Sequence, residues 1–150
     1  MRMKALLPLM MPLVGVLSFG SAASAQQSGT AADAQALLTK GVAAVKADKA
    51  GALAKFDDPN GGFKDRDLYV FCFDSTSGIF LAGPLKGKDV KTAKDSTGKA
   101  FGQEMLDKAK DGEVVTVDYM FPRPNTTTPV AKESFVEGIG DIACGVGYYK

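Results

Sequence analysis

The segment that decides the fold is DLYVFCFDSTSGIFLAGP, residues 67–84. Two apolar runs rich in aromatic and β-branched residues flank the polar turn formers of residues 74–78, and this pattern predicts a β-hairpin. The first run is apolar at odd and even positions alike, whereas a strand with one face in water has a polar residue at every second position. We therefore expect this strand to be covered on both faces, by helices on one and by a second layer on the other.

The first 25 residues have the composition of a secretory signal peptide. Arg2 and Lys4 precede a mostly apolar stretch, and a small-residue cleavage site, Ala-Ser-Ala, occupies residues 23–25. We expect cleavage after Ala25 and therefore a periplasmic or secreted protein. A retained membrane anchor is the weaker alternative, because two prolines and a glycine interrupt the apolar stretch.

The rest of the chain is expected to form a flexible lead at residues 26–34 and one domain at residues 35–150. The sequence has 18 basic and 17 acidic residues, and two of the basic ones belong to the signal peptide, so the exported chain is almost neutral. It contains no block of lysine or arginine. Nothing therefore favours binding to nucleic acid, and no membrane insertion is expected after signal cleavage.

Hydrophobic periodicity predicts the other elements. Apolar residues at three- and four-residue spacing indicate an amphipathic helix from Thr30, with Thr30 or Asp33 as its N-cap. It is followed up to Phe56 by a second short helix or a prolongation broken near Gly51. A further helix is expected within residues 96–111, and strands at residues 113–121, 130–139 and 141–149.

This order of elements predicts an α+β domain with one antiparallel five-stranded sheet. An N-terminal helix precedes the sheet, and another helix separates its second and third strands. One face of the sheet should pack on the N-terminal helix. A pocket would lie on the opposite face, beneath residues 83–111.

The composition excludes several kinds of chemistry. The chain has no histidine, which removes Ser-His-Asp and Cys-His catalytic sites, histidine metal sites and imidazole acid–base catalysis. No P-loop is present, and the Gly-x-Gly pairs near the C-terminus lack the following helix that a dinucleotide site requires. We expect no enzymatic activity, no metal site and no cofactor.

Aromatic residues and a few polar side chains remain as candidates for a binding site. Such an inventory suits a small-molecule pocket, but it equally suits an ordinary core. Lys132, inside a predicted strand, could face a pocket or the solvent. The residues are Tyr69, Phe71, Phe73, Phe80, Phe101, Tyr119, Phe121, Phe135, Tyr148 and Tyr149, together with Arg123 and Lys132.

The two cysteines, Cys72 and Cys144, both lie in apolar strand-like segments. Export makes a disulfide chemically possible. Two buried free thiols are an equal alternative at this point, because a disulfide requires close and specific geometry that a sequence does not reveal.

A series of short motifs in a fixed order resembles the single Cache domains, which are extracytoplasmic sensor modules of PAS-like fold. The resemblance covers about residues 35–150. In chain order the motifs are Phe63-x-Asp65-x-Asp67-Leu68-Tyr69-Val70-Phe71, Asp74-x-x-x-Gly78, Leu81-Ala82-Gly83-Pro84, Leu85-x-Gly87-Lys88-Asp89, Asp95-x-x-Gly98-Lys99-x-Phe101, Tyr119-x-x-Pro122, Lys132-x-x-Phe135 and Gly145-Val146-Gly147-Tyr148-Tyr149.

The resemblance implies a long helix leading into an antiparallel sheet that cradles a small molecule, often a short carboxylate or an amine-bearing metabolite. Typical members are receptor ectodomains that act in signal transduction through chemotaxis or histidine-kinase outputs. This chain ends just after the last predicted strand, at Lys150. We therefore expect a freestanding exported Cache domain that binds a ligand and acts alone or as an accessory to a membrane receptor.

The resemblance also implies a set of ligand-facing residues. An inward-facing Lys132 would need an anionic partner, which a ligand carboxylate could supply, and Tyr119 could donate a hydrogen bond to the same group. Many relatives carry His-Pro where this chain has Gly83-Pro84, so the pocket should be more apolar or larger than usual. The predicted walls are Phe71, Phe80, Phe101 and Tyr148.

Two further expectations follow from the resemblance. The first and last strands of a PAS-like sheet are neighbours, which would bring Cys72 and Cys144 together as a disulfide. The alternative to ligand binding is an interaction module, in which side chains fill the pocket and an exposed face docks a membrane receptor or forms a homodimer.

Overall fold

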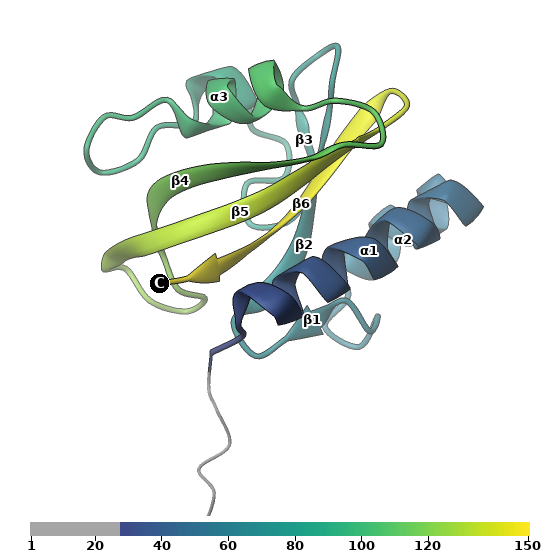
Figure 1. Cartoon of the computed structure of the whole chain (residues 1–150), viewed down its shortest axis with the longest axis horizontal. Helices are drawn as coiled ribbons and strands as arrows, with labels where there is room; N and C mark the ends of the chain where they lie inside the picture. The colour runs from purple at the N-terminus through teal and green to yellow at the C-terminus, as the bar shows by residue number, and fades with distance from the viewer. Residues whose placement is uncertain (1–27) are drawn as a thin grey trace, which may run out of the picture.

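The computed structural model describes residues 28–150, so the predicted signal peptide and the first residues of the predicted lead lie outside the described part. Helices pack on both faces of a central sheet (Figure 1), with two N-terminal helices on one face and a short helix on the other. The elements are α1 (Ala31–Ala47), α2 (Lys49–Asp57), β1 (Lys64–Asp65), β2 (Leu68–Asp74), β3 (Phe80–Ala82), the 3-10 helix η1 (Val90–Thr92), α3 (Phe101–Lys108), β4 (Val114–Pro122), β5 (Pro129–Ile139) and β6 (Ile142–Tyr149).

The sheet confirms the predicted α+β architecture. Its strands are antiparallel and run in the order β1-β2-β6-β5-β4, with β3 beside the second half of β2. Five of these strands are the predicted ones, and the sixth, β1, is a two-residue strand of exposed charged residues that carries no hydrophobic pattern. The hairpin of β2 and β3 thus forms as predicted, and β2 lies inside the sheet beside the last strand.

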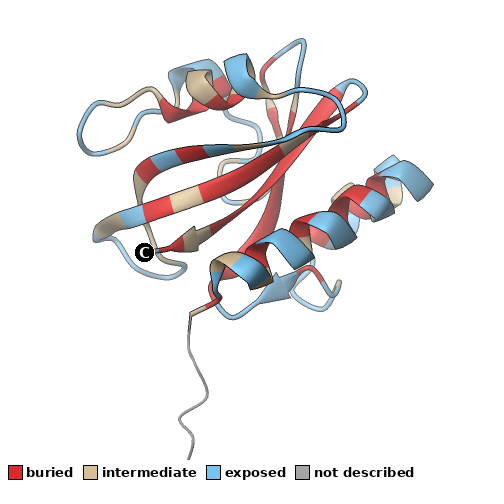
Figure 2. Cartoon of the chain, in the orientation of Figure 1, coloured by how far each residue is buried: buried red, intermediate tan, exposed pale blue. Residues whose placement is uncertain are grey.

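The position of β2 explains why it is apolar at every position. Leu68, Val70 and Cys72 belong to a core beneath α1 and α2. Tyr69, Phe71 and Phe73 belong to a second core beneath η1 and α3. Figure 2 shows β2, β6 and much of β5 buried between the two helical layers, while the edge strand β4 and the outer faces of the helices carry exposed residues.

A disulfide joins Cys72 of β2 to Cys144 of β6, which are register partners at the middle of the sheet. Both residues are fully buried in the core beneath α1. The strand order that the resemblance implied therefore brings the two cysteines together.

The N-terminal helices begin and break at identifiable caps. Thr30 caps α1 in a capping box with Asp33, so α1 starts at Ala31, inside the segment predicted as a flexible lead. The predicted second short helix is present as α2, and the break before it lies at Asp48, because the Asp48 carboxylate accepts a hydrogen bond from the Gly51 amide and caps α2. In the part of the chain that the structure covers, no helix is both long and apolar enough to span a bilayer.

The helix predicted within residues 96–111 is shorter, because residues 95–99 form a turn that serves the edge of the sheet. Asp95 accepts hydrogen bonds from the Lys99 amide and from the Met120 amide of β4. Lys99 and Lys108 donate their ammonium groups to main-chain carbonyls of the same strand. Side chains around α3 thus satisfy backbone groups of an edge strand that would otherwise be open to pairing.

Candidate functional site

A row of three polar-tipped side chains crosses the sheet on the side of α3. Tyr119 of β4 is the register partner of Lys132 of β5, and Lys132 is the register partner of Tyr149 of β6. Side chains of directly opposed residues in antiparallel strands lie on the same face of the sheet. The pairing therefore gathers three side chains that are far apart in the sequence.

Lys132 reaches into an aromatic cage, which we define as Tyr69, Tyr119, Phe121 and Tyr149. Its side chain is 1% exposed, and its Nζ donates a 2.8 Å hydrogen bond to the Tyr69 hydroxyl. The distances from Nζ to the ring centroids are 4.4 Å for Tyr69, 4.8 Å for Tyr149, 5.1 Å for Phe121 and 6.0 Å for Tyr119. The faces of aromatic rings attract a cation, so the cage offsets part of the cost of burying the amine.

Among residues 28–150, no carboxylate forms an ion pair with Lys132. The ion pairs found in residues 28–150 join other side chains. The nearby carboxylate of Asp67 is bound instead by Arg123 Nη1 at 2.6 Å and by the Gly29 amide at 2.7 Å. Burial lowers the pKa of Lys132 to about 7, and the negative charge of Asp67 opposes this shift only in part.

The other polar atoms of the cage are satisfied within the protein. The Tyr119 and Ser134 hydroxyls share a hydrogen bond of 2.9 Å, and the Tyr149 hydroxyl donates to the Pro122 carbonyl at 2.7 Å. Burial raises the pKa of Tyr69 and of Tyr119 well above that of a free tyrosine, and raises that of Tyr149 to about 12. All three phenols therefore stay protonated at neutral pH and are able to donate hydrogen bonds.

Two glycines of β6 make space for the site. A Cβ atom on Gly147 would lie 2.3 Å from Lys132 Cε and 2.4 Å from Ser134 Oγ. A Cβ atom on Gly145 would lie 2.5 Å from the tip of the Phe71 ring. The Gly-Val-Gly sequence is therefore required because the Phe71 and Lys132 side chains lie flat against this strand.

We expect Gly147→Ala to destabilise the protein by about 1–3 kcal/mol, because the added methyl group overpacks the site and must displace the stem of Lys132. The measurement is the free energy of unfolding in denaturant. Gly41→Ala in α1 is the matched control, because its Cβ would meet Val70 at an ordinary 3.4 Å and helix propensity favours alanine. Equal effects of the two substitutions would contradict the packing that we describe.

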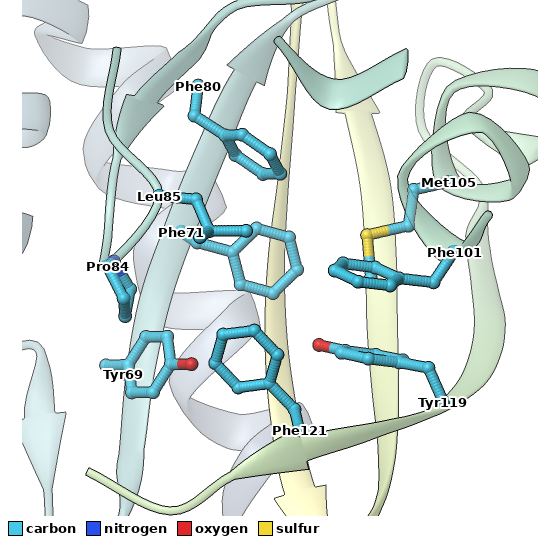
Figure 3. Close-up of a pocket in the computed structure, with 9 residues that line it drawn as sticks. All are labelled: Tyr69, Phe71, Phe80, Pro84, Leu85, Phe101, Met105, Tyr119 and Phe121. Carbon is cyan, nitrogen blue, oxygen red and sulfur yellow. The ribbon is translucent and has the colours of Figure 1, made fainter. Parts of the chain in front are cut away.

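Next to the cage lies a small apolar cavity of about 20 Å³. Figure 3 shows its walls, with Phe101 and Met105 entering from α3, Pro84 and Leu85 from the loop after β3, and the Tyr69 and Tyr119 hydroxyls directed toward the space around Phe121. This volume is only slightly more than the roughly 10–15 Å³ that one water molecule requires. The lining residues are Tyr69, Phe71, Phe80, Pro84, Leu85, Phe101, Met105, Tyr119 and Phe121.

A wider groove of about 750 Å³ adjoins this cavity, and the two share Tyr69, Pro84 and Phe121 as walls. Arg66 and Arg123 stand along the groove. The guanidinium of Arg123 lies 4.6 Å from the centroid of the Tyr149 ring, whose other cationic neighbour is Lys132. The three shared side chains therefore separate an open, partly basic groove from the buried amine.

The structure places the predicted site residues in different positions. Phe71, Phe80, Phe101, Tyr119 and Pro84 line the cavity. Lys132 faces inward but lies behind Tyr69 and Phe121, and so does not itself line the cavity. That any of these residues binds a ligand stays a prediction.

Gly83 contributes through its backbone. Its φ of +97° and a Cβ position 2.7 Å from Phe71 Cβ both require glycine, and its amide donates to Asp57 Oδ1 at 2.9 Å. Glycine at this position therefore allows the loop to pack directly on Phe71 and its amide to bind the end of α2.

Tyr148 is not a wall of the pocket, which corrects our prediction. It lies on the opposite face of the sheet, where it stacks on Phe135 and donates to Glu133. Tyr149 occupies the pocket face instead, and Tyr69 and Phe121 complete the cage. Register supplies the missing signal, since Tyr149 is the strand partner of Lys132 and Tyr69 is two residues before Phe71.

Comparisons with known proteins agree on one family. The Cache domain family model matches residues 49–148, whereas a search of curated proteins found no significant match. A crystal structure of a methyl-accepting chemotaxis protein from Vibrio parahaemolyticus is 22% identical, with a TM-score of 0.65 over 79% of this chain and 86% of that one.

Two further solved structures have a similar fold. A periplasmic sensor domain of a chemotaxis protein is 24% identical, with a TM-score of 0.60 over 77% of this chain and 86% of that one. A Cache chemosensory domain, described for its recognition of carboxylic acid, is 25% identical, with a TM-score of 0.59 over 77% and 84%. This chain belongs to the Cache domain family, whose PAS-like α+β fold it shares.

Proposed function

We propose that this protein is an exported, sensor-type Cache domain that binds a small organic anion, such as a short carboxylate, without catalysis. The observation that carries the proposal is the buried amine of Lys132, which no carboxylate of the described residues neutralises. An unpaired buried charge is costly, so an amine kept in such a place has a use beyond stability.

The surroundings of the amine suit a carboxylate with a short apolar remainder. Lys132 would supply the charge, and the Tyr69 and Tyr119 hydroxyls are positioned as donors on the cavity side. The other walls are phenylalanine, leucine and methionine side chains. A mostly apolar pocket with a few placed polar groups is the usual form of a small-molecule site.

Similarity to other proteins adds support. One structural neighbour of this chain is a Cache domain that recognises carboxylic acid, and another is the periplasmic sensor domain of a chemotaxis protein. Together with the signal peptide that the sequence predicts at residues 1–25, they favour a role in the periplasm or outside the cell. There the domain would act in signal transduction, by itself or with a membrane receptor.

A thermal-shift assay with short carboxylates, amines and purines tests the proposal. At one hundred times its dissociation constant a ligand stabilises the folded state by about 2.7 kcal/mol, which gives a clear increase in the melting temperature. We expect this increase with at least one carboxylate for the unmodified protein and for Lys46→Met, an exposed lysine of α1. Lys132→Met and Lys132→Ala should lose it while remaining folded.

A stabilising carboxylate whose effect survives in Lys132→Met would contradict the assignment of the amine as the anion site. If no carboxylate in the panel raises the melting temperature, the proposed function itself is contradicted.

The small size of the cavity supports a second candidate, the protein-interaction module. Side chains leave only about 20 Å³ free, so a ligand must displace Tyr69, Phe121 or the Pro84 loop in order to reach Lys132. If the pocket instead stays closed, an exposed face would dock a membrane receptor or a second copy of the chain. A dimer in sedimentation of the pure protein would favour this candidate. So would capture of a binding partner from an envelope fraction, if Lys132→Met captures the same partner equally well.

A further inference from the structure

In the part of the chain that the structure describes, the amine of Lys132 is the one cation inside the cage. Each element packed against it contributes titratable or polar groups that are neutral: Tyr69 from β2, Tyr119 from β4, Tyr149 from β6, and Ser134 from its own strand. Asp67 and Arg123 near the cage neutralise each other in an ion pair of 2.6 Å. The cage therefore provides one positive charge, and no free carboxylate that would hold a ligand's amine.

A site with one charge favours a ligand with one opposite charge. A second carboxylate on the ligand would be buried without a cation, and an ammonium group on the ligand would be placed beside Lys132 without an anion. The Arg123 guanidinium does not change this balance, because Asp67 already neutralises it. Among small acids, monocarboxylates fit the site best.

Protonation of the amine is coupled to the arrival of that ligand. With the pKa of Lys132 near 7, a large fraction of the free protein carries a neutral amine at slightly alkaline pH. A carboxylate in contact with the amine raises its pKa, because the ammonium form gains an opposite charge in a medium of low dielectric constant. Binding of the anion and binding of the proton therefore promote each other.

We propose that the aromatic cage takes up a small monocarboxylate together with one proton, so that the pocket binds, in net terms, the undissociated weak acid. The amine of Lys132 accepts the proton from solution and becomes the counter-ion of the ligand carboxylate. This inference rests on the proposed carboxylate-binding function, and it specifies the class of ligand and the control of binding by pH.

Calorimetry with sodium propionate tests the proton uptake. Titrations at pH 8 in phosphate and in Tris, which have different heats of ionisation, give the number of protons bound from the difference in the observed heats. We expect nearly one proton per propionate bound. The dissociation constant should be constant from pH 5.5 to 6.5 and should rise about tenfold for each pH unit well above the pKa of Lys132.

The ligand class is tested with two acids of the same carbon count, malonate and β-alanine. We expect each to bind at least about tenfold more weakly than propionate at pH 6.5, because each adds a charge that the cage does not neutralise. Tighter binding of malonate or β-alanine would overturn the assignment of the class.

Lys132→Arg separates charge from proton uptake, since a guanidinium keeps its proton throughout this pH range. If the variant binds propionate, its affinity should be independent of pH and no proton should be taken up. If the variant does not fold or bind, the comparison of phosphate and Tris buffers on the unmodified protein still tests the proton uptake.

Propionate binding with no proton uptake, and with a dissociation constant that does not change between pH 7 and 9, would overturn this inference while leaving the carboxylate-binding function in place. If none of the acids binds at pH 6.5, both this inference and the proposed carboxylate-binding function are contradicted.

Discussion

Lys132→Met is expected to make the free protein more stable at neutral pH while abolishing carboxylate binding. Replacing a buried charged group by an apolar side chain of similar shape is often stabilising, by about 1–4 kcal/mol. Methionine has an unbranched stem similar to that of lysine and suits a cage of aromatic rings. The measurement is the free energy of unfolding in denaturant without ligand, with Lys46→Met as the control for removal of an exposed lysine charge.

The pH dependence gives this prediction a second readout. Lys132 has a pKa of about 7 in the folded protein, below the value near 10.4 of the unfolded chain. Between these two values the unfolded state binds more protons, so the contribution of Lys132 to stability rises with pH. The advantage of Lys132→Met should therefore be largest at pH 7 and below, and should shrink as the pH approaches 10.

A variant that is less stable than the unmodified protein at every pH would show that the amine contributes to the fold through its cage contacts. Such a result would remove the argument that the lysine is kept for a ligand. An advantage that does not change with pH would contradict the lowered pKa instead.

Much of the fold could be predicted because local signals and tertiary structure agree. The apolar residues at every position of β2 predicted cover on both of its faces, and Thr30, the observed N-cap of α1, was one of the two predicted caps. Signals of side-chain capping were harder to recognise. Asp48 breaks the helix where Gly51 was expected to do so, because the glycine accommodates the cap and does not end the helix itself.

The candidate site could be predicted only in part, because the sequence does not always indicate which face of the sheet a strand residue occupies. Val115, Val117 and Tyr119 alternate along their strand, which indicates that they share a face. The sequence left Lys132 facing either a pocket or the solvent, and only the structure shows it buried. The sequence Gly-Val-Gly-Tyr-Tyr gives no such indication, because glycine marks no face and both tyrosines are large. Choosing Tyr148 over Tyr149 was therefore an error of one residue, which moved the side chain to the opposite face of the sheet. Tyr69 is ambiguous for the same reason, since every position of β2 is apolar.

Removal of the disulfide is expected to cost a large part of the stability of this domain. The bond closes a loop with a sequence separation of 72 residues between β2 and β6. The chain-entropy model gives about 4 kcal/mol for a loop of this length, and removal of a native disulfide from a small exported domain typically costs about 2–5 kcal/mol. Domains of this kind have total stabilities of about 5–15 kcal/mol.

The double substitution Cys72→Ala/Cys144→Ala tests this expectation without leaving a free thiol. Its unfolding free energy in denaturant should be lower by about 2–5 kcal/mol. Because both cysteines are fully buried, a reductant should attack the bond only after the protein unfolds, so the native protein should keep its melting curve in mild reductant. Alkylation of the unfolded, non-reduced protein should leave its mass unchanged. Two added alkyl groups in that experiment, or a double variant as stable as the unmodified protein, would contradict a structural disulfide that holds the centre of the sheet together.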